Sequence, residues 1–377
     1  MTTKAKIFEA IHSRNCYSVF AHAFRQRDWS VVGRGWDETR IKLDGHIDNP
    51  DLPDVNLDNL LSIYVENILY AQKAVMVWVV EKDIAKRLFD NLEEFVQEEE
   101  NKYKGTFPFP LNEDDLRTQG GFGVPTHVYE VNGAKTLIYA SKRESAVETL
   151  LELDSLPDEW KNKGYVEVVG KKTEVTQVFD SITVEPTHGL VELRIDRAKT
   201  LAEKDLTKYK EALRSRFNQR SREVLGFDVL KQEPLNIYPA LHPLYEGRAW
   251  TINRIGHQNE GGYVNSNKGR RKDDDVRNDV YHKHGEEAVA SLDLWSIAVV
   301  FNSPEGSGNP GLVIDGHSKI LSMQNPVLYI ARILDCASEQ DYRLVRDSLL
   351  ECCTEGERRH DAANDNSAES KADAAAA

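Results

Sequence analysis

The chain has 377 residues, 40% of them hydrophobic and 29% charged, and its formal net charge is −14. This length suits about two domains of roughly 150 residues each, and the composition is that of a soluble globular protein rather than a disordered chain. The negative charge disfavours non-specific binding of nucleic acid by the whole surface, but it leaves room for a local basic face.

Cysteine spacing and hydropathy bear on the cellular location. The four cysteines are Cys16, Cys336, Cys352 and Cys353. They contain no Cys-x-x-Cys pair and fit neither a zinc ribbon nor a disulfide framework, so we expect reduced, partly buried thiols. The first residues lack the apolar core of a signal peptide, and the longest apolar run is far too short to span a bilayer. We therefore expect a cytoplasmic protein that does not bind membranes.

The first part of the chain predicts mixed structure. Apolar spacing predicts a helix over 56–72, and the apolar run 73–82 predicts a buried strand. A second helix is expected over 82–104, with Asp83 as its cap. The Gly- and Pro-rich segment 105–125 has no periodicity and predicts a long loop.

The next segment predicts a hairpin and a helix. Strands are expected over 126–131 and 135–141, because Asn132-Gly133 between them is a strong hairpin signal. The following residues, 142–160, predict a short helix that ends at Pro157.

The centre of the chain predicts a second hairpin followed by a long basic helix. Strands are expected over 176–185 and 190–196. In the second strand Glu192, Arg194 and Asp196 alternate with apolar residues, which predicts one face on the core and one in water. An amphipathic helix follows and stops at Gly226.

The last third predicts strands and then two closing helices. The expected strands are 247–255, 291–301 and 311–315, and the expected helices are 325–337 and 338–353, the latter capped by Ser338. From 354 onward the composition predicts disorder. The fold class is therefore α+β, with two mixed domains at 1–165 and 166–353 and a disordered tail at 354–377.

The central helix is the first candidate site. From Arg194 to Arg222 ten basic residues oppose four acidic ones, so this segment carries about +6. Such segregation suits contact with phosphates, since basic side chains release condensed counterions. A solvated face, or a docking face for an acidic partner, is the alternative. The candidate phosphate-binding residues are Lys204, Lys208, Arg214, Arg216, Arg220 and Arg222 of the helix, and Arg270, Arg271 and Lys272 of a later loop.

The stretch 269–288 is the second candidate site. Asp275, Asp279, His282 and His284 are residue types that bind a divalent metal ion. The alternative is a solvated loop that enters a strand at 280–281, and its aspartates could also pair with the basic helix. Apart from this metal ion, no cofactor is expected.

Three functions follow from these candidates. Charge segregation favours a non-enzymatic, nucleic-acid-associated protein that is a subunit of a larger, bacterial-type assembly. The Asp/His stretch suggests instead a metal-dependent hydrolase, for example a nuclease, in which the metal polarises a phosphoryl group. The third interpretation is a protein–protein adaptor whose basic helix meets an acidic partner.

Overall fold

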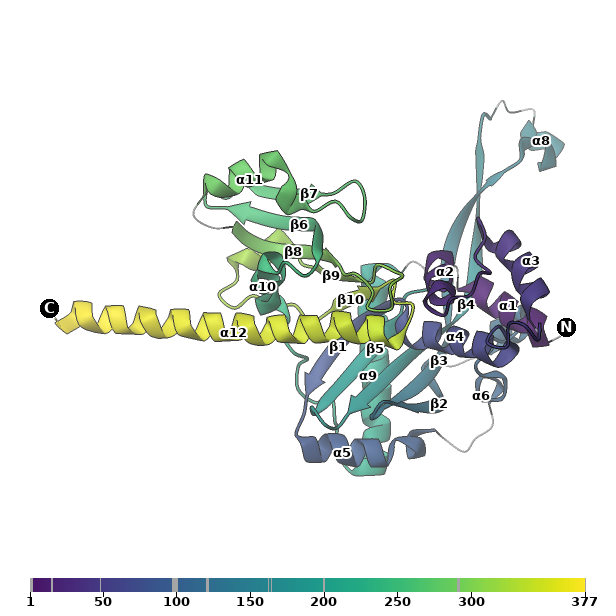
Figure 1. Ribbon diagram of the computed structural model, residues 1–377, viewed down its shortest axis with the longest axis horizontal. Coiled ribbons are helices and arrows are strands. Elements are labelled where there is room, and N and C mark those ends of the chain that lie inside the picture. Colours follow the sequence, from purple (N-terminus) through teal and green to yellow (C-terminus); the bar gives the residue numbers. More distant parts are fainter. Residues whose placement is uncertain are drawn as a thin grey trace.

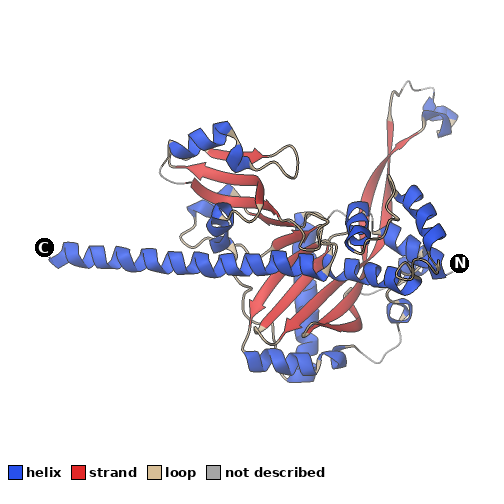
Figure 2. Cartoon of the chain, viewed as in Figure 1, coloured by secondary structure: helices blue, strands red, loops and turns tan. Residues whose placement is uncertain are grey.

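The computed structural model describes residues 3–376 except 15, 48, 97–100, 120–121, 162, 164, 199–200 and 290–291, with side chains as far as 362. Its strands form one ten-stranded sheet in the order β2-β3-β4-β5-β1-β10-β9-β8-β6-β7 (Figures 1 and 2). Every neighbouring pair is antiparallel. The predicted α+β class is confirmed. The strands are β1 (Lys73–Val79), β2 (Val124–Val131), β3 (Ala134–Leu151), β4 (Val168–Glu185), β5 (Leu190–Asp196), β6 (Thr251–Asn259), β7 (Val264–Lys268), β8 (Leu292–Val300), β9 (Gly311–Asp315) and β10 (Ala331–Leu334).

Helices cover both faces of this sheet. The alternation in β1 separates two hydrophobic cores: Val75 and Val77 face the first, whereas Ala74, Met76 and Trp78 face the second. The predicted buried strand is thus confirmed, because both of its faces are covered. The first core takes residues from α1 (Thr3–Ser13), α2 (Tyr17–Gln26), α3 (Trp36–His46), α4 (Leu57–Tyr70), α6 (Lys102–Thr106), α7 (Glu113–Thr118), α10 (Leu241–Glu246) and α12 (Glu339–Ala376), and the second from α5 (Lys82–Asp90) and α9 (Glu203–Leu225).

Three of the expected turn and cap signals are confirmed. Asn132 and Gly133 have φ of 49° and 77°, the positive values that a tight hairpin turn requires. Gly226 ends α9 in the left-handed conformation, with φ of 90°. The Ser338 hydroxyl accepts a hydrogen bond from the Asp341 amide at the start of α12. All four cysteines are free and buried.

Two expected helices are strands instead. Residues 142–151 continue β3, which pairs with β4 along its length, from Lys135↔Val184 to Leu151↔Val168. Residues 331–334 form β10, which fills the place between β1 and β9. In both segments pairing with a neighbouring strand overrides helix-forming composition.

Further differences concern helix ends and loops. Asp83 does not cap α5, whose N-cap residue is Glu81. The expected loop 105–125 contains α7, which Asn112 caps by accepting a hydrogen bond from the Asp115 amide. Residues 280–281 begin α11 (Val280–Glu287) rather than a strand.

Part of the tail is more ordered than its composition predicts, and the domain division stays untested. α12 includes 354–362, where disorder was expected, and Arg359 there pairs with both Glu355 and Glu246. These pairs and the packing of Gly356 against Pro239 give this part of the tail contacts that its composition did not indicate. The division after 165 stays a prediction, although strands on its two sides pair in one sheet. Within the described residues, no helix combines the length and apolar character needed to cross a membrane.

Candidate functional site

Several arginines of the basic helix, α9, contact neighbouring segments of the same chain. Arg214 donates hydrogen bonds to the carbonyls of Leu230, Lys231 and Gln232. Arg220 bonds Glu223 and the Glu94 carbonyl, and Arg222 pairs with Asp228. These three arginines therefore hold neighbouring segments in place.

The exposed face of α9 is close to neutral. Its exposed basic residues are Lys204, Lys208, Arg216 and Arg222, and its exposed acidic residues are Glu203, Glu211 and Glu223. Arg194 and Arg197 precede the helix, and Lys199 lies outside the described residues. The segregation that the sequence indicates is thus much weaker on the surface that a polyanion would meet.

The loop triplet near 270 is exposed. Lys272 pairs with Asp335, and the Arg271 amide donates to Asp274. Asp275 bonds Arg277 of its own segment. None of these hydrogen bonds and ion pairs joins an aspartate of the loop to α9. They therefore do not provide the link between the two regions that the sequence suggested.

The four candidate metal ligands do not converge. Asp275 holds Arg277, and Asp279 caps α11 through the His282 amide. The buried His282 ring bonds the Tyr245 hydroxyl at 2.8 Å, while the exposed His284 lies 3.5 Å from Glu287. In the part of the chain that the structure describes, no group of three or more His, Cys, Asp or Glu side chains is placed to hold a metal ion.

The charged face of β5 is the main departure from the sequence-based expectation. Glu192, Arg194 and Asp196 were expected to face water, but their exposed fractions are 1%, 2% and 0%. The expectation was wrong because α4 and α12 cover this face of the sheet. The Tyr70 ring of α4 lies 5.8 Å from the Arg194 guanidinium, and the Tyr342 hydroxyl of α12 donates to Glu192. Alternation of polar and apolar residues cannot distinguish water from a covering layer that carries opposite charges.

One end of this charged face centres on Asp196. Its carboxylate accepts from Arg14 at 2.7 Å and lies 3.6 Å from the ammonium group of Lys73. Burial alone would raise the pKa of Asp196, but Arg14 and Lys73 outweigh it and hold this pKa well below its usual range. Burial also lowers the pKa of Lys73 to about 8, and Asp196 only partly opposes this change.

The other end centres on Glu192. Its carboxylate accepts from Arg194, from the Tyr342 hydroxyl and from Arg346. Burial would raise the pKa of Glu192, but the two arginines lower it to about 2. Arg346 also bonds Glu185, so α12 is tied to β4 and β5 by buried ion pairs.

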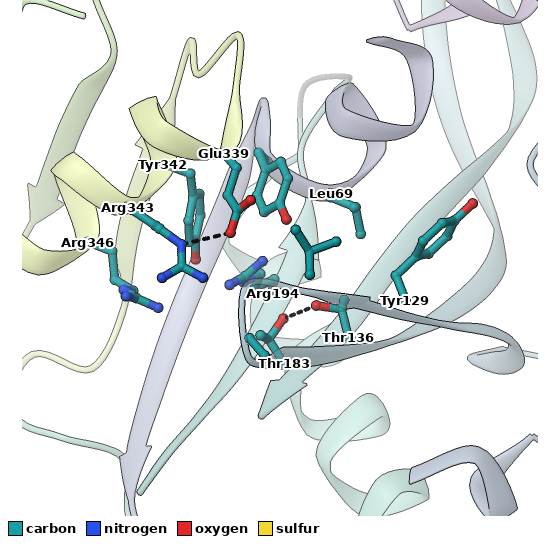
Figure 3. A pocket seen from close by; sticks show the side chains of 12 residues that line it. Leu69, Tyr129, Thr136, Thr183, Arg194, Glu339, Tyr342, Arg343 and Arg346 are labelled. Atoms are coloured by element: carbon teal, nitrogen blue, oxygen red, sulfur yellow. Dashed lines mark hydrogen bonds and ion pairs between the residues drawn. The ribbon is translucent and has the colours of Figure 1, made fainter. Parts of the chain in front are cut away.

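A groove of about 700 Å³ adjoins this charged face. It lies between α2, α4, the end of β2 and the start of α12, and Leu69, Tyr70, Tyr129, Val131 and Glu339 line both the groove and a recess of about 20 Å³ beside it. Figure 3 shows the recess, with Arg194 on the sheet and Arg343 and Arg346 on the neighbouring helix. The lining comes from elements distant in sequence, so no spacing along the chain could reveal this site.

A long hairpin projects from the same sheet. Neighbouring strands pair with β3 only as far as Ala140 and with β4 only from Ser181, so the outer ribbon, 145–174, pairs only with itself. We name these residues the hairpin arm; it carries α8 (Asp158–Lys161) near its end (Figure 1). Seven of the fifteen exposed large hydrophobic side chains found in the described ranges belong to it, namely Leu150, Leu151, Leu153, Trp160, Tyr165, Val166 and Val169.

Sequence reasoning missed both the groove and the arm. The sequence does contain a signal for the arm. Leu150 and Val169, which pair in the hairpin, lie on opposite sides of a turn-rich segment and at the same distance from it. Protein-family models do not match this chain, and a comparison with curated proteins also finds no match.

Proposed function

We propose that this protein is a component of a larger protein assembly and that its hairpin arm docks on a partner protein. The observation that carries the proposal is the group of apolar side chains exposed on the arm, above all Val166 at 93%, Tyr165 at 48% and Trp160 at 45%. Exposed apolar groups of this kind mark protein interaction sites, and Trp and Tyr are the residues that most often dominate binding energy.

The architecture of the arm supports the same proposal. An isolated two-stranded ribbon is marginally stable in water, because it has no layer on which to bury its apolar side chains. A partner that covers Trp160, Tyr165 and Val166 supplies that layer. At about 25 cal/mol per Å² of buried apolar area, a few such side chains contribute several kcal/mol to docking.

Cross-linking in cells tests the proposal. We expect that the full chain with a photo-crosslinking amino acid in place of Tyr165 forms a discrete adduct with another protein after irradiation in its source cells. The triple variant Trp160→Ser/Tyr165→Ser/Val166→Ser should no longer co-purify with that partner. A matched control, Val280→Ser/Tyr281→Ser, changes two other exposed apolar residues, which lie on α11, and should retain the partner. Absence of any adduct from position 165, or loss of the partner in the control alone, would contradict the proposal.

Association with nucleic acid remains a second proposal. The exposed Lys204, Lys208, Arg216 and Arg222 of α9 support it, and the three acidic residues on the same face weaken it. The test is binding of a labelled DNA duplex at low and moderate salt by the wild-type chain and by a variant with these four residues changed to Glu. Steeply salt-dependent binding that the variant loses supports this function, and identical binding by both chains excludes α9 as the contact.

A further inference from the structure

Arg194 has one buried donor group without an acceptor. Its Nε and Nη2 atoms both lie 2.9 Å from Glu192, and its guanidinium stacks 4.2 Å from the centre of the Tyr342 ring. Its Nη1 atom is buried and has no hydrogen-bond partner among the described residues. An unpaired buried donor on a charged group is costly, so a group that accepts this hydrogen bond binds there favourably.

The recess beside Arg194 has room for a small acceptor. Its volume of about 20 Å³ is enough for one water-sized group. The charges around it are already balanced, because three carboxylates bond its three arginines: Arg194 and Arg346 bond Glu192, and Arg346 also bonds Glu185. Arg343 bonds Glu339 (Figure 3). A neutral carbonyl oxygen therefore suits the recess better than a carboxylate or a phosphate, which would add an uncompensated negative charge.

The groove also contains a buried acceptor without a donor. Gln26 donates from Nε2 to the Ser307 carbonyl at 2.7 Å and to Asp341 at 3.1 Å. Both of these atoms only accept, which fixes the orientation of the amide and leaves Gln26 Oε1 buried and unpaired within the described part of the chain. The recess is thus lined by a residue with an unpaired donor and the groove by a residue with an unpaired acceptor, the two kinds of group that pair with a peptide backbone.

The charge of the groove selects a positive ligand. Four acidic residues line it, namely Asp58, Glu66, Glu305 and Glu339, against the single basic residue Arg27. Burial raises the pKa of Glu66, and its Arg27 partner only partly opposes this change. A positive side chain placed between these carboxylates would relieve their mutual repulsion.

The walls and size of the groove fit an extended chain. Leu61, Val65, Tyr70, Tyr129 and Val131 provide apolar surface along it. Tyrosine rings also bind ammonium and guanidinium groups over their faces. A volume of about 700 Å³ falls within the range of pockets that enclose much of a bound ligand.

We propose that this groove binds an extended basic peptide segment, with a backbone carbonyl oxygen in the recess at Arg194 and lysine or arginine side chains between Asp58, Glu66 and Glu305. The proposal goes beyond the assembly role of the hairpin arm and does not depend on it, because the two regions share no residue.

Fluorescence anisotropy with synthetic peptides tests this proposal. The probe is a labelled octapeptide of alternating lysine and valine with blocked ends, and its counterpart replaces each lysine by glutamate. We expect the full chain to bind the basic peptide saturably and not to bind the acidic one. The variant Asp58→Asn/Glu305→Gln should weaken binding by about tenfold or more, which corresponds to ~1.4 kcal/mol.

Two substitutions locate the binding. Val131→Trp places a larger side chain in the lining of the groove and should abolish binding, whereas Val280→Trp on α11 changes an exposed valine elsewhere and should leave binding unchanged. Spermine, a polycation without carbonyl groups, should compete only weakly. The proposal is overturned by absence of saturable binding, by equal binding of the acidic peptide, by full binding to the Val131→Trp chain, or by spermine competing as strongly as the peptide.

Discussion

The strands β3 and β4 pass through two different environments along their length. In the inner part Arg143 and Asp180 are buried and bond each other at 2.6 Å. In the outer part the register partners Glu148 and Lys171 are exposed, with a separation of 2.9 Å. Apolar residues show the same order, since Ile182 is fully buried while Leu150 is 64% exposed.

This contrast shows that the layers over a strand decide what its side chains do. The inner ribbon is covered on both faces by helices, so each of its buried charges needs a partner. Removal of one partner destabilises the fold, because the other charge is then buried alone. Among the described residues no layer covers the outer ribbon, so its charges interact through water and its apolar side chains remain available to another molecule.

The largest expected effect is at the inner ion pair. Asp180→Ala removes the partner of Arg143 and also the acceptor of the Asp196 amide. We expect the free energy of unfolding at pH 7 to fall by about 3–5 kcal/mol, because a buried charge is left unpaired. Urea-induced unfolding followed by tryptophan fluorescence measures this change.

The matched control is the outer ion pair. Glu148→Ala removes the partner of the exposed Lys171, and surface pairs contribute about 0–1 kcal/mol. Equal losses in the two variants would show that the inner and outer parts of the hairpin do not differ in the way that their burial indicates.

The same contrast explains how far the sequence predicts this fold. The turn at Asn132-Gly133, the stop at Gly226 and the apolar run of β1 depend on local chemistry, and all three were predicted. Residues 142–151 were expected to be helical because their strand partner, 168–177, lies beyond a connection whose length the pattern did not indicate.

The sites were less predictable for a related reason. Glu192 and Asp196 look like a solvated strand face until Arg14, Lys73 and Arg346 are brought to them from distant segments. The groove likewise joins Gln26, Glu66, Val131 and Glu339, which no motif links. The basic residues of α9 were counted correctly from the sequence. Several of its arginines, however, form tertiary contacts within the chain, which the count could not indicate.

The next largest effect concerns the pH dependence of stability. The pKa of Lys73 is about 8 in the folded chain, below its ordinary value of 10.5. Between these two pH values Lys73 binds more protons in the unfolded chain than in the folded chain. Its contribution to the free energy of unfolding therefore rises as pH goes from 8 towards 10.5, and this gain is lost as pH falls back through 8. Since one pKa unit is worth about 1.4 kcal/mol, we expect a differential effect of about 1 kcal/mol or more.

Two lysine substitutions isolate this effect from other groups that titrate at high pH. Lys73→Met should remove this rise. The free energy of unfolding of the wild-type chain should therefore increase relative to that of the variant between pH 8 and pH 10. Lys171→Met changes a lysine that is 71% exposed on the arm and should leave the pH profile parallel to that of the wild-type chain. Chemical denaturation at a series of pH values decides this, and parallel profiles for all three proteins would contradict the role of Lys73.

The smallest effect on stability is expected at the end of the arm. Trp160→Ser, Tyr165→Ser and Val166→Ser replace side chains that are already 45%, 48% and 93% exposed, so each should change the free energy of unfolding by less than about 0.5 kcal/mol. The buried Ile182 of the inner ribbon provides the contrast, because Ile182→Ala should cost about 2–5 kcal/mol. The three arm substitutions together should instead reduce binding of a fluorescent dye that reports exposed apolar surface. A large loss of stability from them would mean that the arm packs against its own chain, and the arm would then not be free to dock on a partner.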